Sequence, residues 1–320
     1  MFNRFLFLIL ILGIAADVGA QAYPSKSVRM VVPYPPGGGA DIVGRVFGEK
    51  LGGRWGQQVL IENMAGASGM IAAEAVARSA PDGYTLLLGS DQILTINPGL
   101  YRKLSYDPVK GFEPIGLVAA ITFALVVHPD VQARSVQELI ALARSRPGQL
   151  NYASIGAGSQ HHLGMELFKT TAGVDLVHVP YKGSAQYLPD LLSGRVAIIF
   201  TGLPPVLQQI KTGKLRALAV GSFQRSAVLP EVPTVAESGL PGFQMGAWFG
   251  VLAPGGTPRE IVAWLNRELV QVANLSEVRD RLAPQGAQPV NSTPEQFGAQ
   301  IKAEMAKWIP VIKVSGARPE

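Results

Sequence analysis

Short apolar runs rich in β-branched residues alternate along the chain with longer stretches in which apolar residues recur every three or four positions. The first pattern is typical of strands and the second of helices, so their alternation predicts βαβ units and a mostly parallel sheet flanked by helices, an α/β fold. The pattern predicts nine strands, at 28–33, 59–62, 84–89, 123–128, 150–154, 176–180, 196–200, 215–220 and 248–253.

Several helix starts are marked by a capping box, in which a hydroxyl and an acid or amide three residues later satisfy free backbone N–H groups. The four boxes begin at Ser135, Thr234, Thr257 and Thr293. The helix predicted after Thr293 carries one apolar stripe, formed by Phe297, Ile301, Met305 and Trp308. We expect this stripe to be core rather than a membrane-binding face, because lysines and glutamates are mixed on the opposite side.

The first 22 residues have the pattern of a secretory signal peptide. Arg4 precedes an apolar segment at 5–16, and small residues allow cleavage after Ala20 or Ala22. An uncleaved anchor is the weaker alternative, because a spanning helix needs about 20 apolar residues. The chain has no cysteine, which excludes disulfides, thiolate metal ligands and a lipidated N-terminal cysteine. These features predict a periplasmic protein without a lipid anchor.

Composition narrows the partner classes. The 320 residues are 48% hydrophobic and 16% charged, which fits a folded chain long enough for two domains. The net charge is +5, but no run of five or six like charges occurs, so a nucleic-acid partner is not supported. We expect no cofactor, no metal and a monomer.

A glycine-rich loop between a strand and a helix start occurs twice. The loop after 28–33 contains Tyr34, Gly37, Gly38, Gly39, Ala40 and Asp41. The loop after 150–154 follows Ser154 and contains Gly156, Gly158 and Ser159. Such loops expose backbone N–H groups and the positive end of a helix dipole, so each favours an anion.

A third loop of this kind, with Ala67 and Ser68, follows the strand at 59–62. Any one of these loops alone is more often a tight connection than a binding site. Three loops at the carboxyl ends of strands in one α/β chain favour a ligand site instead. If so, Gly38→Val or Gly158→Val should abolish binding and leave folding cooperative.

Other chemistries lack their motifs. Neither glycine-rich loop completes G-x-G-x-x-G, and no P-loop, H-E-x-x-H or G-x-S-x-G sequence occurs. Ser159 and His162 stand three residues apart and could form a nucleophile–base pair of a hydrolase. No orienting carboxylate accompanies them, so the simpler interpretation is that Ser159 caps the helix and His162 packs beneath the loop.

Many sequence blocks in a fixed order resemble one family of proteins. These blocks are PYPPGGGAD at 33–41, GASG at 66–69, PDGYTL at 81–86, NPGLY at 97–101, VPYKG at 179–183, GKLRALAV at 213–220, PTVAE at 233–237 and PGGTP at 254–258. In these blocks the chain resembles the Bug (Bordetella uptake gene) family, the extracytoplasmic solute receptors of tripartite tricarboxylate transporters.

The resemblance implies a two-lobed periplasmic binding protein of the type II-like, Venus-flytrap kind. Lobe 1 would comprise 23–124 and 248–320, and lobe 2 would comprise 125–247. The ligand would be a small di-, tri- or aromatic carboxylate, delivered to the permease subunits of the transporter. The ligand loops implied are 34–41 and 67–68 on one lobe and 154–159 on the other.

Two departures from the family pattern bear on the ligand. Met64 and Ala65 replace a frequent Arg-Pro, and Thr201 stands where Asp is common. If position 201 faces the cleft, a threonine in place of aspartate neither repels an anionic ligand nor offers a partner to a ligand amine. Alternatively, Thr201 only caps the next turn. Ser90 and Asp91 are further candidates for reading the distal end of the ligand. A periplasmic module that signals to a sensor partner remains the alternative to a transport receptor.

Overall fold

The computed structural model describes residues 23–318, so the predicted signal peptide lies outside the described residues. The strands are β1 (Val28–Val32), β2 (Val59–Asn63), β3 (Thr85–Ser90), β4 (Phe112–Val127), β5 (Asn151–Ser154), β6 (Val177–Pro180), β7 (Ile198–Gly202), β8 (Arg216–Val220), β9 (Gly246–Pro254) and β10 (Ala287–Pro289). The helices are α1 (Gly39–Trp55), α2 (Met70–Ala77), α3 (Asn97–Leu100), α4 (Val136–Ser145), α5 (Gln160–Ala172), α6 (Ser184–Leu192), α7 (Leu207–Lys211), α8 (Arg259–Ala273), α9 (Ser276–Leu282) and α10 (Pro294–Ser315).

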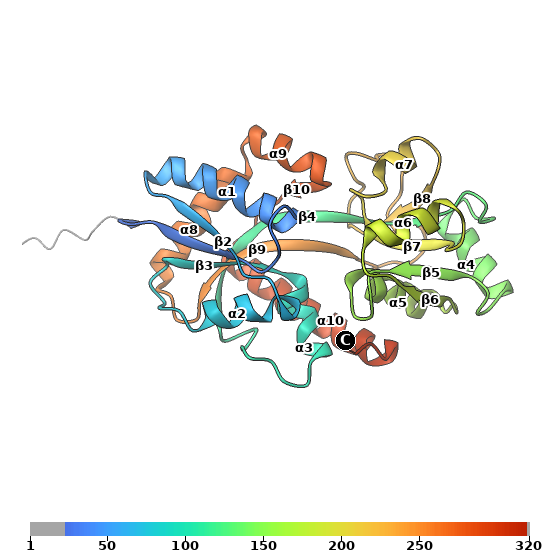
Figure 1. Cartoon of the computed structure of the whole chain (residues 1–320), viewed down its shortest axis with the longest axis horizontal. Helices are drawn as coiled ribbons and strands as arrows, with labels where there is room; N and C mark the ends of the chain where they lie inside the picture. Colours follow the sequence, from blue (N-terminus) through green and yellow to red (C-terminus); the bar gives the residue numbers. More distant parts are fainter. Residues whose placement is uncertain (1–22, 319–320) are drawn as a thin grey trace, which may run out of the picture.

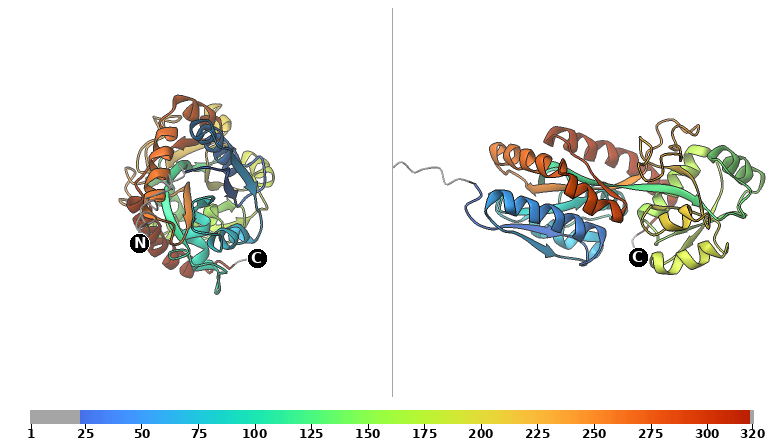
Figure 2. Two further views of the ribbon diagram at one scale, coloured as in Figure 1. Left: turned by 90° about the vertical axis from the view of Figure 1, so that its left-hand side faces the viewer. Right: turned by 90° about the horizontal axis from the view of Figure 1, so that it is seen from above.

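Two α/β halves lie side by side, joined by the long strands β4 and β9 (Figure 1). The view from above shows the same connection (Figure 2). We call the half that holds β1 to β3 lobe 1 and the half that holds β5 to β8 lobe 2. The strand order is β2-β1-β3-β9-β4-β7-β5-β6, with β8 and β10 also paired to β4. The predicted α/β fold class is confirmed.

The pairing within the sheet is more mixed than predicted. β1 pairs in parallel with β2 and β3, and β5 pairs in parallel with β6 and β7. The connecting strands β4 and β9 pair antiparallel with each other and with β7 and β3. The prediction of a mostly parallel sheet therefore describes the outer part of each half, while the strands that join the halves run antiparallel.

Strand β4 takes part in both halves. Its first part, up to Thr122, pairs with β9, and its last part, from Phe123, pairs with β7. The change of partner falls close to the predicted lobe boundary at 124/125. The segment before Phe123 was not predicted as strand, because Pro114 and Gly116 interrupt its apolar pattern.

Each half has helices on both faces of its part of the sheet. In lobe 1, α1 and α8 bury Phe47 and Leu265 against one face, and α2 and α10 bury Val76 and Phe297 against the other. In lobe 2, α4 and α5 cover one face, and α6 covers the other. Both halves thus form three layers with their own apolar cores.

Helix α10 contributes to both cores. Phe297 and Ile301, near its start, pack in lobe 1, whereas Trp308 and Ile312, near its end, pack with lobe 2. The predicted apolar stripe is core, as expected. The assignment of 248–320 to lobe 1 stays a prediction, and the end of α10 lies within that range although Trp308 and Ile312 contact the lobe 2 core.

The capping boxes were predicted with mixed success. Ser135 caps α4, and Thr293 forms a complete box at α10. Thr257 does not cap α8, because Pro258 is the N-cap and the Thr257 hydroxyl donates to the Pro254 carbonyl at 2.8 Å. Thr234 makes both bonds of a box with Glu237, but only a turn follows there.

Within residues 23–318, no helix combines the length and the apolar character that crossing a membrane requires.

Candidate functional site

A cavity of about 760 Å³ lies between the two halves. The residues that line it come from the β1–α1 loop, the end of β3, the two joining strands, α5, the start of α6 and the end of β7. They are Tyr34–Ala40, Ser90, Asp91, Ile121, Phe123, Ile155, Gln160, His161, Gly183, Ser184, Tyr187, Thr201, Gly202, Pro204, Pro205, Ala247 and Phe249. A ligand in this space would contact both halves.

The N-terminus of α1 opens on the cavity without a side-chain cap. Gly38 is the N-cap residue and makes no capping hydrogen bond through a side chain. Within residues 23–318, the N–H groups of Gly38, Gly39 and Ala40 make no protein hydrogen bond. Unsatisfied N–H groups at the positive end of a 17-residue helix favour an anion beside them.

Asp41 braces this loop from behind. Its carboxylate accepts the Gly37 amide at 2.9 Å, the Arg45 guanidinium at 2.9 Å and the Asn63 side-chain amide at 2.9 Å. Asn63 also donates to the Tyr34 carbonyl at 3.0 Å. Mainly through Arg45, these bonds lower the pKa of Asp41 from 3.8 to about 2. Asp41 does not line the cavity, so its charge positions the loop and leaves the amides to the ligand.

The lobe 1 wall continues with Tyr34, Ser90 and Phe249. The Tyr34 and Ser90 hydroxyls are hydrogen-bonded at 2.7 Å. The Tyr34 ring meets the edge of Phe249 with centroids 6.4 Å apart. Burial raises the pKa of Tyr34 above its ordinary value, so its hydroxyl stays protonated and can donate or accept a hydrogen bond.

The lobe 2 wall contains a hydrogen-bonded trio. The Thr201 hydroxyl lies 3.1 Å from Nε2 of His161 and 3.0 Å from the Tyr187 hydroxyl. The His161 ring also packs against Phe123, with centroids 5.3 Å apart. Burial lowers the pKa of His161 to about 4, so its imidazole is neutral near pH 7. Thr201 therefore lines the cavity, and it holds two aromatic side chains in place.

The glycines of the second predicted loop do not line the cavity. The Gly158 amide donates to Nδ1 of His162 at 3.1 Å, and the Gly156 amide donates to the Ser154 hydroxyl at 3.0 Å. Ser159 caps α5 by accepting the His162 amide. Because these groups bond to one another, they offer few free donors to a ligand. Ile155 is the loop residue that reaches the cavity.

The opposing lobe instead presents a helix start that the sequence reasoning did not assign to the site. Gly183 is the N-cap of α6, has no side-chain cap and lines the cavity together with Ser184. A single glycine after Tyr181 and Lys182 gives a weaker signal than a glycine-rich loop. The family block at 179–183 was the sequence feature that could have located it.

The predicted site residues thus fall into two groups. Those lining the cavity are Tyr34, Gly37, Gly38, Gly39, Ala40, Ser90, Asp91 and Thr201. Those outside it are Asp41, Ala67, Ser68, Ser154, Gly156, Gly158 and Ser159. In the second group, the Ser68 hydroxyl bonds to that of Tyr101 at 3.0 Å, and its carbonyl accepts the Asn97 amide at 3.0 Å.

The arrangement of Ser159 and His162 does not fit a hydrolase. The Ser159 hydroxyl donates to the Gly156 carbonyl at 2.7 Å. Nδ1 of His162 accepts from a backbone amide, and its ring stacks on His178 with centroids 4.1 Å apart. Within residues 23–318, no hydrogen bond joins the Ser159 hydroxyl to the imidazole, so the nucleophile–base contact is missing.

Asp91 forms a direct bond between the two lobes. One carboxyl oxygen of this residue, which is only 1% exposed, accepts from the Gln160 side chain at 2.5 Å. Its other oxygen is buried without a hydrogen-bond partner within the described chain. Burial raises the pKa of Asp91 well above its ordinary value, and Glu304 adds to the effect.

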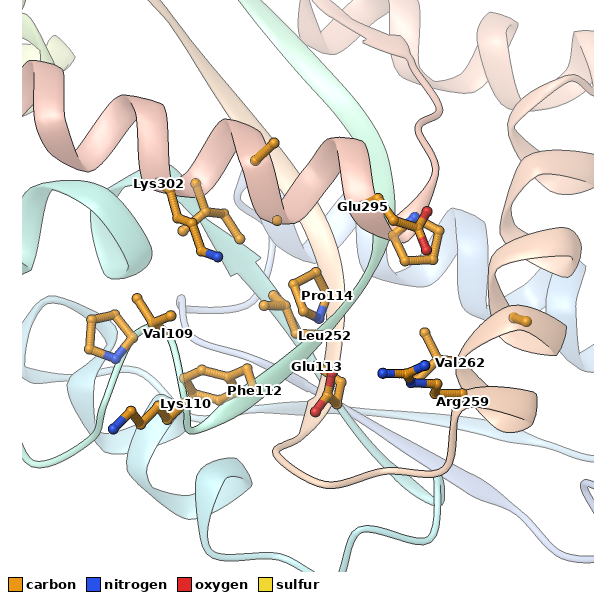
Figure 3. Close-up of a pocket in the computed structure, with 16 residues that line it drawn as sticks. Val109, Lys110, Phe112, Glu113, Pro114, Leu252, Arg259, Val262, Glu295 and Lys302 are labelled. Atoms are coloured by element: carbon orange, nitrogen blue, oxygen red, sulfur yellow. The ribbon is translucent and has the colours of Figure 1, made fainter.

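A larger cavity of about 850 Å³ lies on lobe 1 between α8 and α10. Lys110 and Lys302 lie on one side of it and Arg259 and Glu295 on the other (Figure 3). None of the predicted site residues lines it, and its charges are mixed. In residues 23–318, no group of acidic or histidine side chains is arranged to hold a metal ion.

Two α/β halves around a shared cavity, with an open helix N-terminus in its wall, define the class of solute-binding receptors. The model of one family, the tripartite tricarboxylate transporter family receptor, matches residues 43–317. The chain belongs to this family. The resemblance inferred from its sequence blocks is confirmed.

Individual relatives support the assignment. The chain is 41% identical over 307 residues to Protein BugT of Bordetella pertussis (strain Tohama I), which covers 96% of this chain and 94% of BugT. The R. palustris protein Rpa4515, solved with adipate, is 38% identical with a TM-score of 0.76, over 93% of this chain and all (100%) of that one. MatC from Rhodopseudomonas palustris, solved with bound malate, is 34% identical with a TM-score of 0.72, over 91% and 100% of the two chains.

Proposed function

We propose that this protein is a periplasmic receptor that captures a small carboxylate between its lobes and delivers it to the permease of a tripartite transporter. The observation that carries the proposal is the uncapped start of α1, where Gly38, Gly39 and Ala40 leave their N–H groups free at the cavity. Each charge-assisted N–H···O bond contributes about 1.5–3 kcal/mol. A carboxylate can therefore be held without an arginine.

The second lobe supports the proposal with its own helix start. Gly183 leaves α6 uncapped at the opposite wall of the same cavity. A ligand that bonds to both lobes binds the closed form more tightly and shifts the population toward closure. The permease then distinguishes loaded from empty receptor by shape. The carboxylates bound by the two R. palustris relatives are compatible with this chemistry.

The proposal is tested by a thermal-shift panel of mono-, di-, tri- and aromatic carboxylates on protein that has been unfolded and refolded to remove copurified ligand. A ligand at 100 times its Kd stabilises the fold by about 2.7 kcal/mol, which raises the melting temperature measurably. Calorimetry then gives the affinity of each hit. Absence of binding by every carboxylate, in protein that melts cooperatively, would contradict the proposal.

Gene deletion separates transport from signalling. Loss of uptake of the bound acid supports delivery to a permease. Unchanged uptake with altered transcription would show that the receptor serves a sensor instead.

A further inference from the structure

The cavity of about 850 Å³ on lobe 1 is separate from the cavity between the lobes, and the two share no lining residue. Its floor includes Pro114 of β4 and Leu252 of β9, and its walls are the start of α8 and the first half of α10 (Figure 3). All of its lining residues lie in parts of these elements that belong to lobe 1. We call this cavity the lobe 1 groove.

Three cations stand at the groove without an acidic partner. Lys110 and Lys302 lie on one side of it and Arg259 on the other (Figure 3). All three residues are exposed, and none of their side chains forms an ion pair within residues 23–318. Arg259 is also the first residue of α8, where the positive end of the helix dipole disfavours a cation. Helix stability therefore does not account for its presence.

The acids at the groove are already engaged by hydrogen bonds. Glu113 accepts from the Gly256 amide at 3.2 Å. Glu295 lies in the first turn of α10, where hydrogen bonds with its own amide and with the helix cap lower its pKa. Asp107, just before the groove residues, accepts two amides of the turn that follows it, at 2.8 and 2.9 Å. An anionic group that enters the groove would therefore meet cations with which no acid of this chain is paired.

Gly298 keeps the groove open. It lies inside α10, where glycine is less favourable than alanine. The backbone does not require a glycine there, because its φ is not positive and an added Cβ would meet only Pro114, at an ordinary 3.6 Å. Val109, at the rim, is a large apolar side chain that is 43% exposed. An apolar side chain of a partner would gain stability by burial at this position.

Building on the proposed function, we propose that the lobe 1 groove docks an acidic segment with apolar side chains on the periplasmic side of the permease. Cytoplasmic loops of membrane proteins carry the excess of lysine and arginine, so their periplasmic side is poorer in positive charge. A concave groove also receives a protruding segment better than a flat lipid surface. A second copy of this chain, whose net charge is +5, would be repelled.

The position of the groove within one lobe determines what docking there reports. A rigid-body movement of the lobes leaves the geometry inside each lobe unchanged. The groove should therefore dock loaded and empty receptor alike, and the permease would read closure through contacts elsewhere. Empty receptor should then compete with loaded receptor for the permease.

Uptake by proteoliposomes that contain the permease tests this docking. The assay uses the purified mature receptor and the acid identified by the thermal-shift panel, and it measures the receptor concentration that gives half-maximal uptake. The double variant of Lys110→Glu and Lys302→Glu should raise this concentration by about tenfold or more, because like charges then face the acidic segment. Added salt should raise it for the natural receptor and change it less for the variant.

Matched controls reverse exposed cations on the same two helices but outside the groove. They are Arg267→Glu in α8 and Lys313→Glu in α10, and each should stay within about twofold of the natural receptor. Calorimetry should give an unchanged Kd for the acid in every variant, because none of these residues lines the cavity between the lobes.

Gly298→Leu tests the shape of the groove without changing its charge. It should raise the half-maximal concentration as the charge variant does, while the melting temperature does not fall, because leucine is the better helix former. If Gly298→Leu does not fold, the charge variant decides alone.

The outcomes separate the docking from the proposed function. Half-maximal concentrations within about twofold of the natural value for the charge variant and for a folded Gly298→Leu overturn the docking and leave delivery standing. Failure of empty receptor to compete does the same. Failure of the natural receptor to drive any uptake would instead overturn the proposed delivery itself.

Three other occupants of the groove would also overturn the docking. A receptor dimer that dissociates in Lys302→Glu would show a second copy of this chain. Binding to vesicles that lack the permease, lost in the same variant, would show a lipid surface. A second calorimetric binding event of a small acid, again lost in Lys302→Glu, would show a metabolite site.

Discussion

Replacing Gly38 by valine tests the amide site at α1 directly. The backbone of Gly38 has φ −79° and ψ 170°, an extended conformation that valine adopts readily. A Cβ there would meet only the Pro35 carbonyl oxygen, at 3.7 Å, which is ordinary contact. The substitution should therefore leave the fold intact while its methyl groups occupy space beside the free N–H groups.

The magnitude follows from the bonds that would be lost. If the methyl groups prevent one to two charge-assisted hydrogen bonds, each worth about 1.5–3 kcal/mol, binding weakens by about 1.5–6 kcal/mol. This range corresponds to a loss of affinity of between tenfold and about 10⁴-fold. The unfolding free energy should fall by only about 1 kcal/mol, because valine is a poorer N-cap residue than glycine while no packing and no side-chain cap are removed.

Calorimetry with the tightest acid of the panel, together with thermal melts, measures both quantities. Gly53→Val is the matched control, because Gly53 lies in the same helix with nothing within 4 Å of its added Cβ. The control should bind normally. Affinity within twofold of the natural protein for a well-folded Gly38→Val would refute the assignment of the carboxylate to this helix start.

Three further predictions concern stability and are checked by denaturant or thermal unfolding. The folded pKa of Asp41 is lowered from 3.8 to about 2, so its contribution to stability is present above pH 3.8 and lost as the pH falls through 2. Asp41→Asn should therefore cost about 1–2 kcal/mol at pH 7 and weaken the loss of stability between pH 3.8 and 2. Ser159→Ala should cost about 1 kcal/mol by removing the cap of α5, and an unchanged melt would contradict that role. Gly158→Ala should cost about 1–2 kcal/mol, because φ is +76° and the added Cβ would lie 2.9 Å from Leu100; a neutral effect would show that the loop relaxes.

The last of these predictions corrects an expectation from the sequence. Gly158→Val was expected to abolish binding without affecting folding. The positive φ of Gly158 and its contact with Leu100 mean that the substitution perturbs the fold, so it cannot test ligand binding cleanly. Gly38 is the informative position of the pair.

Local patterns predicted the strands well and the site only in part. All nine predicted strands overlap observed ones. A run of β-branched residues is a local signal, so it can be recognised without knowing the tertiary structure. The loop at Gly38 was recognised by its glycines. The sequence could not distinguish this loop from the similar one at Gly158. The Gly158 amide donates to the His162 ring, and the orientation of that ring depends on tertiary packing. The role of Gly183 depends on tertiary placement in the same way.

The shared cavity also could not be read from local patterns. Asp91 and Gln160 are 69 positions apart along the chain and meet across the two halves at 2.5 Å. The apolar spacing along α10 does not indicate which core each residue joins. The packing of its first part in lobe 1 and of its last part in lobe 2 was therefore not predicted. These features arise from how the elements are assembled.

The continuity of β4 and α10 through both halves limits how such a receptor can diversify. Since Phe112 to Val127 form one unbroken strand and Trp308 completes the far core, neither half is a module that recombination could exchange intact. Changes confined to the connecting loops and wall residues leave this shared scaffold undisturbed, so they are the simplest source of new ligand preferences.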